Sequence, residues 1–175
     1  MFKKGDYIVY GSTGICVIED ITTMDLPGVT KERLYYVMLP YGKNGNKIFT
    51  PVDNPKMKLR RVLTKEETLA LIDEIPAMEQ VGISEEKLRE QKYKEYLRSC
   101  ECKNWIRMIK TLYHRNQERI SQGKKVTATD ERYFKLAEEN LYTEFSISLD
   151  IPKDKIQEYI EKRLNKESVK ESTAG

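Results

Sequence analysis

The chain has 175 residues, of which 39% are hydrophobic and 34% charged, with 31 Lys and Arg against 28 Asp and Glu. This length allows one sizeable domain or two small ones, and the composition excludes a fully disordered chain. No stretch approaches the roughly 20 apolar residues of a membrane span, and the N-terminus lacks a secretory signal. We therefore expect a cytoplasmic protein without membrane contact. Three cysteines without framework spacing favour a reducing compartment.

Charge is distributed unevenly along the chain. Residues 1–62 carry 10 basic and 6 acidic side chains, residues 63–82 carry 1 and 5, and residues 83–122 carry 10 and 6. Two positive blocks separated by an acidic spacer fit a surface that faces phosphate groups. They fit ordinary variation of a solvated surface equally well.

The first 62 residues predict short β-strands. The β-rich runs are separated by turn signals: a Gly-containing cluster at 11–14, the Pro27-Gly28 break and the Asn44-Gly45 hairpin turn. Four or five short strands are too few for two packed sheets, so they predict a small barrel. The predicted strands cover residues 7–10, 15–18, 21–23, 34–39 and 47–50.

From Thr64 onward the apolar period becomes helical. Thr64 and Glu67 form a capping-box pattern, and Pro76 ends the first predicted helix. Four more helices are expected, beginning near residues 84, 103, 127 and 152. The sequence therefore predicts an α+β protein of two domains. The expected parts are a β domain at 1–62, an acidic linker helix at 63–82, a helical bundle at 83–165 and a disordered tail at 166–175.

Residues that could carry catalysis or bind a metal are scarce. The single histidine, His114, has no partner pattern for a catalytic triad or a zinc site. Cys100 and Cys102 differ from the spacing of zinc and redox motifs, and the glycines do not form a phosphate loop. We expect no enzymatic activity, no metal and no cofactor.

Basic residues are better ordered on two of the predicted helices, where they share one narrow face opposite the apolar residues. These faces hold Lys87, Lys94 and Arg98 on the second helix, and Lys103, Arg107, Lys110 and His114 on the third. Such stripes fit contact with a nucleic-acid backbone, and a solvated face fits equally well. Trp105, the sole tryptophan, is either a core residue or an aromatic that wedges between bases.

Motifs in both halves point to one family. Residues 2–10 read Phe-Lys-Lys-Gly-Asp-Tyr-Ile-Val-Tyr, and residues 14–21 read Gly-Ile-Cys-Val-Ile-Glu-Asp-Ile. Pro51-Val52-Asp53-Asn54 follows the last predicted strand. The helical half contributes Tyr93-Lys94, the segment 116–119 (Asn-Gln-Glu-Arg) and the segment 126–132 (Val-Thr-Ala-Thr-Asp-Glu-Arg). Over about residues 2–164, the chain resembles the CarD/CdnL family of bacterial transcription regulators.

The resemblance implies that residues 1–62 form a Tudor-like, SH3-like β barrel that binds the RNA polymerase β subunit by pairing an edge strand with it. Some relatives carry Arg where this chain has Met24 and Phe49, so an apolar contact replaces a charged one. The implied polymerase-binding positions are Met24, Leu26, Ile48, Phe49 and Thr50.

The resemblance also implies that the helices touch promoter DNA, mainly its backbone and minor groove, at the upstream edge of the melted region. They stabilise the open promoter complex there. Lys94 matches a lysine that contacts the backbone, and Arg89 takes the position of a wedge Trp, so charge is expected to hold the minor groove. The implied DNA-binding residues are Lys87, Arg89, Lys94, Arg98, Arg107 and Lys110.

These expectations combine into one functional hypothesis and one alternative. The hypothesis is a transcription regulator that acts with RNA polymerase on the nucleoid, as a monomer or a strand-exchanged dimer. The alternative is a protein-only adaptor, whose helices bind a second protein and make no direct contact with DNA.

Overall fold

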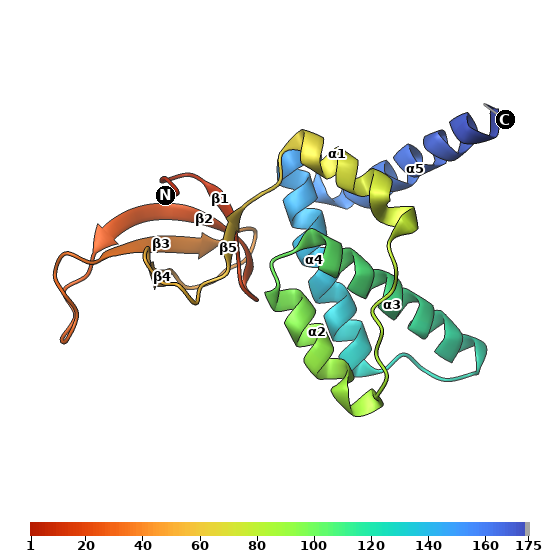
Figure 1. Cartoon of the computed structure of the whole chain (residues 1–175), viewed down its shortest axis with the longest axis horizontal. Helices are drawn as coiled ribbons and strands as arrows, with labels where there is room; N and C mark the ends of the chain where they lie inside the picture. The colour runs from red at the N-terminus through yellow and green to blue at the C-terminus, as the bar shows by residue number, and fades with distance from the viewer. Residues whose placement is uncertain (174–175) are drawn as a thin grey trace. The chain divides into compact units, whose positions relative to one another are not determined.

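The computed structural model describes residues 1–173, which form two compact units. The β unit comprises Met1–Val62 together with the short segment Arg98–Cys100, and the helical unit comprises Leu63–Leu97 and the chain from Glu101 onward. An N-terminal sheet followed by helices confirms the predicted α+β fold (Figure 1).

Five antiparallel strands form one sheet in the β unit. They are β1 (Tyr7–Tyr10), β2 (Gly14–Thr23), β3 (Leu34–Pro40), β4 (Ile48–Pro51) and β5 (Leu59–Arg61). Their order across the sheet is β4-β3-β2-β1-β5 (Figure 1). The register shifts between Ile18 and Asp20 on β2, and a shift of this kind bends the strand and increases its twist.

The sheet is not the closed barrel that the sequence predicts. Closure requires the two edge strands to pair, but β4 pairs with β3 and β5 pairs with β1, at opposite ends of the strand order. Both edge strands are short, with four and three residues, and β4 ends at Pro51, which has no N–H to donate. Strand β5 was not predicted, because two of its three residues are arginines.

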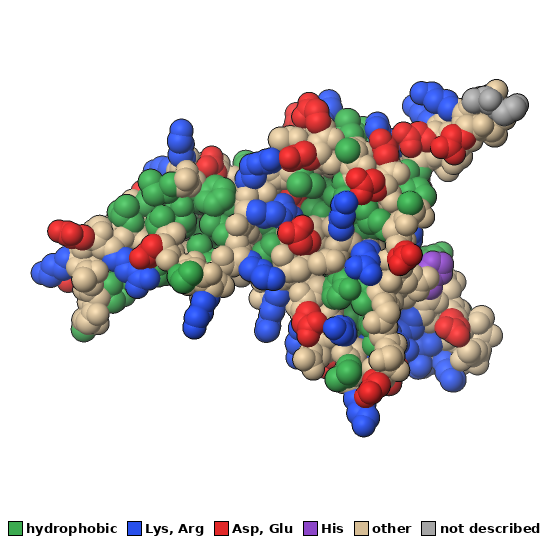
Figure 2. Space-filling view, viewed as in Figure 1, with side chains coloured by type: hydrophobic (Ala, Val, Ile, Leu, Met, Phe, Trp, Pro, Cys, Tyr) green, Lys and Arg blue, Asp and Glu red, His purple; other side chains and the backbone are tan. Residues whose placement is uncertain are grey.

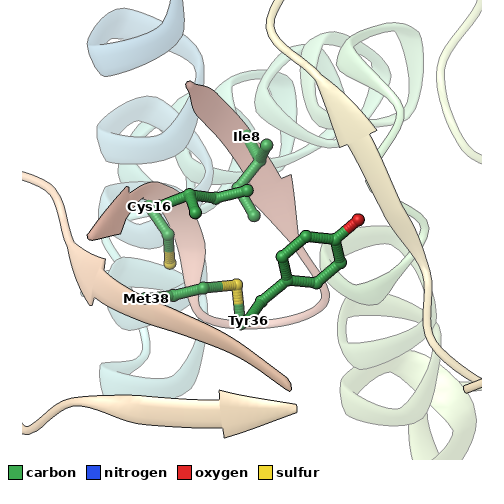
Figure 3. Packing of buried hydrophobic residues seen from close by; sticks show 5 residues of the cluster. Ile8, Cys16, Tyr36 and Met38 are labelled. Atoms are coloured by element: carbon green, nitrogen blue, oxygen red, sulfur yellow. The ribbon is translucent and has the colours of Figure 1, made fainter. Parts of the chain in front are cut away.

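One cluster of buried residues in the β unit lies on one face of the sheet. Ile8, Cys16, Ile18, Tyr36 and Met38 are buried there, and they alternate along their strands as the pleat requires. Figure 3 shows Ile8, Cys16, Tyr36 and Met38 converging from three strands. The β-rich runs that predicted the strands therefore supply the core, and Val9, Ile15 and Val37 on the opposite face are buried as well.

All three cysteines are buried thiols outside any disulfide. Burial raises the pKa of Cys16 to about 11, and the nearby positive charge of Lys43 opposes this shift. The thiolate is the reactive form of cysteine, so the Cys16 side chain stays protonated at neutral pH and behaves as a small apolar residue.

The helical unit contains five α-helices and three short 3₁₀ segments within the described chain. The α-helices are α1 (Lys65–Glu74), α2 (Arg89–Arg98), α3 (Cys102–Ser121), α4 (Ala128–Leu149) and α5 (Ile156–Thr173). The 3₁₀ segments are η1 (Ile75–Ala77), η2 (Glu86–Leu88) and η3 (Lys153–Lys155). None of the helices within residues 1–173 combines the length and the apolar character needed to cross a bilayer.

Helix α1 begins with the capping box that the sequence predicts. Thr64 Oγ1 accepts from the N–H of Glu67 at 3.1 Å, and the Glu67 carboxylate accepts from the N–H of Thr64 at 2.9 Å. Helical structure within the expected linker ends at Ala77. Helix α5 runs through the described part of the expected disordered tail to Thr173, and residues 174 and 175 lie outside the described residues.

Trp105 occupies the centre of the helical core. Its side chain is 0% exposed, and its indole Nε1 donates to the carbonyl oxygen of Leu97 at 3.3 Å. Other buried side chains of the unit are Tyr93 on α2, Leu112 on α3 and Phe145 on α4. Of the two roles considered for Trp105, the structure therefore supports the core residue.

Candidate protein and nucleic-acid interfaces

Strand β4 lies at an edge of the sheet. It pairs with β3 in a register that places Phe49 opposite Val37, and its other side has no partner strand among residues 1–173. An unpaired edge presents main-chain donors and acceptors that can bind a strand from another chain. This edge is the first candidate interface.

The register of β4 fixes which of its main-chain groups face outward. Val52, which follows the strand, donates its N–H to the carbonyl oxygen of Leu34 at 3.0 Å. Hydrogen-bonded pairs recur at every second residue of an antiparallel ladder, so Thr50 and Ile48 also bond toward β3. The N–H and C=O of Phe49 therefore point away from β3, toward the open edge.

The side chains of β4 differ in their availability to a partner. Thr50 is buried with its Oγ1 2.9 Å from Met57 Sδ, and Ile48 packs against the sheet core. Phe49 is 46% exposed. Pro51 has no N–H, so the outward row of donors ends there. Phe49 thus combines an exposed ring with outward-facing main-chain groups.

Met24 and Leu26 lie in the loop between β2 and β3 rather than on a strand. Met24 is half-buried and Leu26 is exposed. Figure 2 shows hydrophobic side chains gathered over β2 and β3 on the viewed face of the β unit. Of the two loop positions, Leu26 is the more accessible to a partner.

The second candidate interface is the basic face of α2 and the 3₁₀ segment before it. Lys87, Lys94 and Arg98 are all exposed. Lys94 Nζ lies 3.4 Å from Glu90 Oε1, one turn earlier on the same helix. Exposed ion pairs of this kind are weak, so Lys94 remains accessible to an external anion.

Arg89 is committed to contacts inside the helical unit. Its Nε donates to the Glu86 carboxylate at 3.1 Å, and its NH1 group donates to the Tyr93 hydroxyl at 3.1 Å. Only 17% of the Arg89 side chain is exposed. Its guanidinium therefore joins two neighbouring side chains of the unit.

Arg107 and Lys110 are likewise engaged, although the sequence places them on the basic face of α3. Arg107 Nε donates to the carbonyl oxygen of Glu79 at 3.1 Å. Lys110 Nζ donates to the carbonyl oxygens of Ile75 and Met78 at 2.9 and 2.7 Å. These two cations hold the segment between α1 and α2 against α3. Their charged groups therefore bind main-chain carbonyl oxygens of the same chain.

A buried polar cluster, which we call the Asp130 cluster, joins α2, α3 and α4. Asp130 accepts from the Tyr93 hydroxyl at 3.0 Å and from Arg115 Nε at 2.7 Å. Arg115 also donates to the Glu86 carboxylate at 2.5 Å. Burial raises the pKa of Tyr93 to about 12. Burial opposes ionisation of Glu86 as well, but hydrogen bonds from Arg115 and Arg89 hold its pKa below the ordinary value.

Arg132 on α4 is a further candidate, outside the DNA-binding residues that the sequence suggests. It donates to Glu90 Oε1 at 3.1 Å, the same oxygen that lies near Lys94. Its guanidinium also stacks over the Tyr133 ring, 4.8 Å from the centroid. Helical periodicity cannot connect α4 with α2, so the spacing of residues gave no signal for this position.

The comparisons with known proteins concern the β unit. Residues 2–63 match the family model described as the CarD-like/TRCF RID domain. A search of curated proteins found no match to the chain. The matched family is a protein-interaction family that binds the RNA polymerase β subunit, and it is not a catalytic family. Residues 2–63 are therefore similar to a CarD-like/TRCF RID domain, and this similarity supports RNA polymerase binding and a role in transcription regulation.

Proposed function

We propose that this chain is a regulator of the CarD/CdnL type, which holds the RNA polymerase β subunit at the β4 edge and touches promoter DNA through α2. The contact with DNA stabilises the open promoter complex, in the cytoplasm where the polymerase acts. The observation that carries the proposal is the open β4 edge at Phe49, inside the matched domain.

At the β4 edge, a strand of the polymerase adds to the sheet as a sixth strand. Main-chain hydrogen bonds supply affinity in such pairing, and alternate side chains supply specificity. Phe49 offers one outward N–H and one outward C=O. Its exposed ring would pack against an apolar side chain of the partner. Pro51 ends the row of donors, which limits the paired segment to a few residues.

The proposed DNA surface consists of the exposed cations Lys87, Lys94 and Arg98. Contacts from Lys and Arg to phosphate supply affinity without reading sequence. Arg89, Arg107 and Lys110 are left out of direct phosphate contact, because their cationic groups already bind groups of the chain. Docking to the polymerase raises the effective concentration of this small surface near DNA, so a net charge of +3 suffices.

The polymerase contact is tested with three variants of the full chain in a pull-down by the isolated β lobe. Phe49→Ala removes only the ring, whereas Phe49→Pro also removes the outward N–H without breaking a bond to β3. We expect weakened capture with the first and loss of capture with the second, both with a native circular dichroism spectrum. Lys47→Ala, in the preceding loop, is the matched control. Unchanged capture by Phe49→Pro would refute pairing at β4.

The DNA contact is tested by reversing two charges on α2. We expect the double variant Lys94→Glu, Arg98→Glu to shorten the lifetime of the open promoter complex while capture by the β lobe persists. Lys162→Glu, Lys170→Glu makes the same change of charge on α5 and serves as the control. Equal open-complex lifetimes in the two double variants would contradict the assignment of the DNA surface to α2.

The alternative function is a protein-only adaptor with no direct contact to DNA. It is favoured by the internal engagement of Arg89, Arg107 and Lys110, three of the six cations that the sequence suggests for DNA. The two functions differ in salt dependence, because phosphate contacts weaken steeply as salt rises. A polymerase–promoter gel shift whose response to salt is the same with and without the chain would favour the adaptor.

A further inference from the structure

Glu90 lies between two exposed cations, Lys94 on α2 and Arg132 on α4. Its Oε1 is 3.4 Å from Lys94 Nζ and 3.1 Å from an NH2 nitrogen of Arg132. The same oxygen accepts a hydrogen bond from the Tyr133 hydroxyl at 3.1 Å. One carboxylate oxygen therefore organises a two-helix cluster of Lys94, Arg132 and Tyr133, which we call the Glu90 cluster.

The carboxylate stays ionised over the physiological pH range. A hydrogen bond from Tyr133 and the positive charge of Lys94 hold the pKa of Glu90 below its ordinary value. Lys94 and Arg132 remain open to solvent, with side chains 50% and 61% exposed. An incoming phosphate can reach both cations, but it meets a fixed negative charge beside them.

The wider surface shows the same interspersed pattern. In Figure 2, Lys and Arg side chains alternate with Asp and Glu side chains over the helical part of the viewed face. A surface of mixed sign attracts a polyanion less than a purely basic stripe does. Glu90 pairs with cations from two different helices, Lys94 on α2 and Arg132 on α4.

We infer that Glu90 restrains phosphate binding by the surface that contains Lys94, and that Arg132 belongs to this surface. The inference rests on the proposed contact with DNA and adds two residues to it. A DNA phosphate that binds Lys94 and Arg132 takes over the role of the carboxylate, so Glu90 lowers affinity by competing for the same two cations. Contact with duplex DNA thereby stays weak until the polymerase holds the chain in place.

The test measures binding of the full chain to a fluorescent duplex of about 20 base pairs by anisotropy, from about 25 to 150 mM NaCl. Glu90→Gln removes the charge and keeps an acceptor for the Tyr133 hydroxyl. We expect about two- to fivefold tighter binding at the lowest salt, the range of exposed ion pairs, and a steeper dependence of affinity on salt. A second readout is the lifetime of the open promoter complex, which should lengthen.

The matched control is Glu95→Gln on the same helix. Glu95 is exposed and pairs with Lys92 at 3.3 Å, outside the Glu90 cluster. Both variants raise the net charge by one, so a purely global effect of charge changes both equally. Arg132→Ala added to Glu90→Gln should abolish most of the gain, because it removes one of the released cations.

Each outcome decides a separate point. Equal gains for Glu90→Gln and Glu95→Gln, or weaker binding by Glu90→Gln, would overturn the restraining role. If the double variant binds DNA as tightly as Glu90→Gln does, Arg132 is not part of the phosphate-binding surface. If neither the unmodified chain nor Glu90→Gln binds the duplex in a salt-dependent way, and open-complex lifetimes do not respond, the proposed contact with DNA fails. Matching urea midpoints of the variants confirm that folding is intact.

Discussion

Arg163 on α5 and Asp73 on α1 form a two-bond ion pair. Nε of Arg163 lies 2.7 Å from Oδ1 of Asp73, and its NH2 group lies 2.8 Å from Oδ2. A planar guanidinium matches a carboxylate in this geometry. Ile156 is the one fully buried side chain of α5 among the described residues, so the ion pair is a main attachment of this helix to the rest of the unit.

The Arg163–Asp73 pair predicts how stability depends on pH. The hydrogen bond from Arg163 lowers the pKa of Asp73 below its ordinary value. A carboxyl with a lowered pKa stabilises the folded state above its unfolded pKa of about 3.9, and this contribution disappears as pH falls through the folded pKa. We expect Asp73→Asn to lower the free energy of unfolding by up to about 1 kcal/mol at pH 7, because the two side chains are 31% and 32% exposed and water weakens their attraction.

Urea denaturation of both proteins between pH 7 and pH 3 measures this effect. The difference between the unmodified chain and Asp73→Asn should be constant near neutral pH and should shrink below about pH 4. A difference that persists unchanged to pH 3 would show that the charge of Asp73 is not its source. Asp154→Asn, an exposed carboxylate in η3, provides the control.

Lys110 is predicted to stabilise the segment between α1 and α2. Lys110→Met keeps much of the aliphatic length but removes the ammonium that binds the carbonyls of Ile75 and Met78. Hydrogen bonds to charged groups contribute about 1.5–3 kcal/mol, and we expect a loss of stability near the lower end. Hydrogen exchange of residues 75–81 should accelerate.

The same variant separates an internal role of Lys110 from a role in DNA binding. If Lys110 acts only on the connecting segment, Lys110→Met leaves the salt dependence of the polymerase–promoter complex unchanged. A clearly flatter salt dependence would instead assign Lys110 a phosphate contact, as the basic stripe of the sequence suggests.

The Asp130 cluster is predicted to be the most sensitive polar site of the helical unit. Asp130→Ala leaves Arg115 without its buried partner, and breaking a buried ion pair costs about 3–5 kcal/mol. Tyr93→Phe removes one hydrogen bond to Asp130 and should cost about 1 kcal/mol. Chemical denaturation monitored by circular dichroism compares the two, and similar costs would contradict the central role of Asp130.

Trp105 provides a direct test of its buried position. As the sole tryptophan, it is the only source of indole fluorescence, and its emission should be blue-shifted in the folded chain and unaffected by duplex DNA. Trp105→Ala should cost about 3–5 kcal/mol of stability. Quenching of the native emission on addition of DNA would mean that the indole reaches the bases.

The strands and helices were largely predictable because local patterns determine them. β-Rich runs bounded by turn signals marked β1 to β4, and the Thr64 capping box marked the start of α1. Strand β5 was not predictable in this way, since Leu59 is its single apolar residue and its pairing with β1 depends on tertiary structure. A closed barrel was predicted where the sheet is open for a similar reason. Local sequence does not encode whether the two edge strands, β4 and β5, pair with each other.

The candidate interfaces were predictable only in part. Periodicity correctly grouped Arg107 and Lys110 on one face of α3, but it could not show that residues 75–80 cover that face. Arg132 lies near Glu90 through packing of α4 against α2, a relation that no periodic pattern contains. The roles of Met24, Leu26 and Phe49 in polymerase binding stay predictions.

The burial of Cys16, Cys100 and Cys102 has a practical consequence for distance measurements. Buried thiols are shielded from maleimides and iodoacetamide, so we expect the three native cysteines to compete little with a cysteine at the surface. A single cysteine introduced on an exposed position of α5 or of the loop between β2 and β3 becomes the preferred attachment point for a spin label or dye. Polymerase-bound and free states can then be compared without first replacing three core residues.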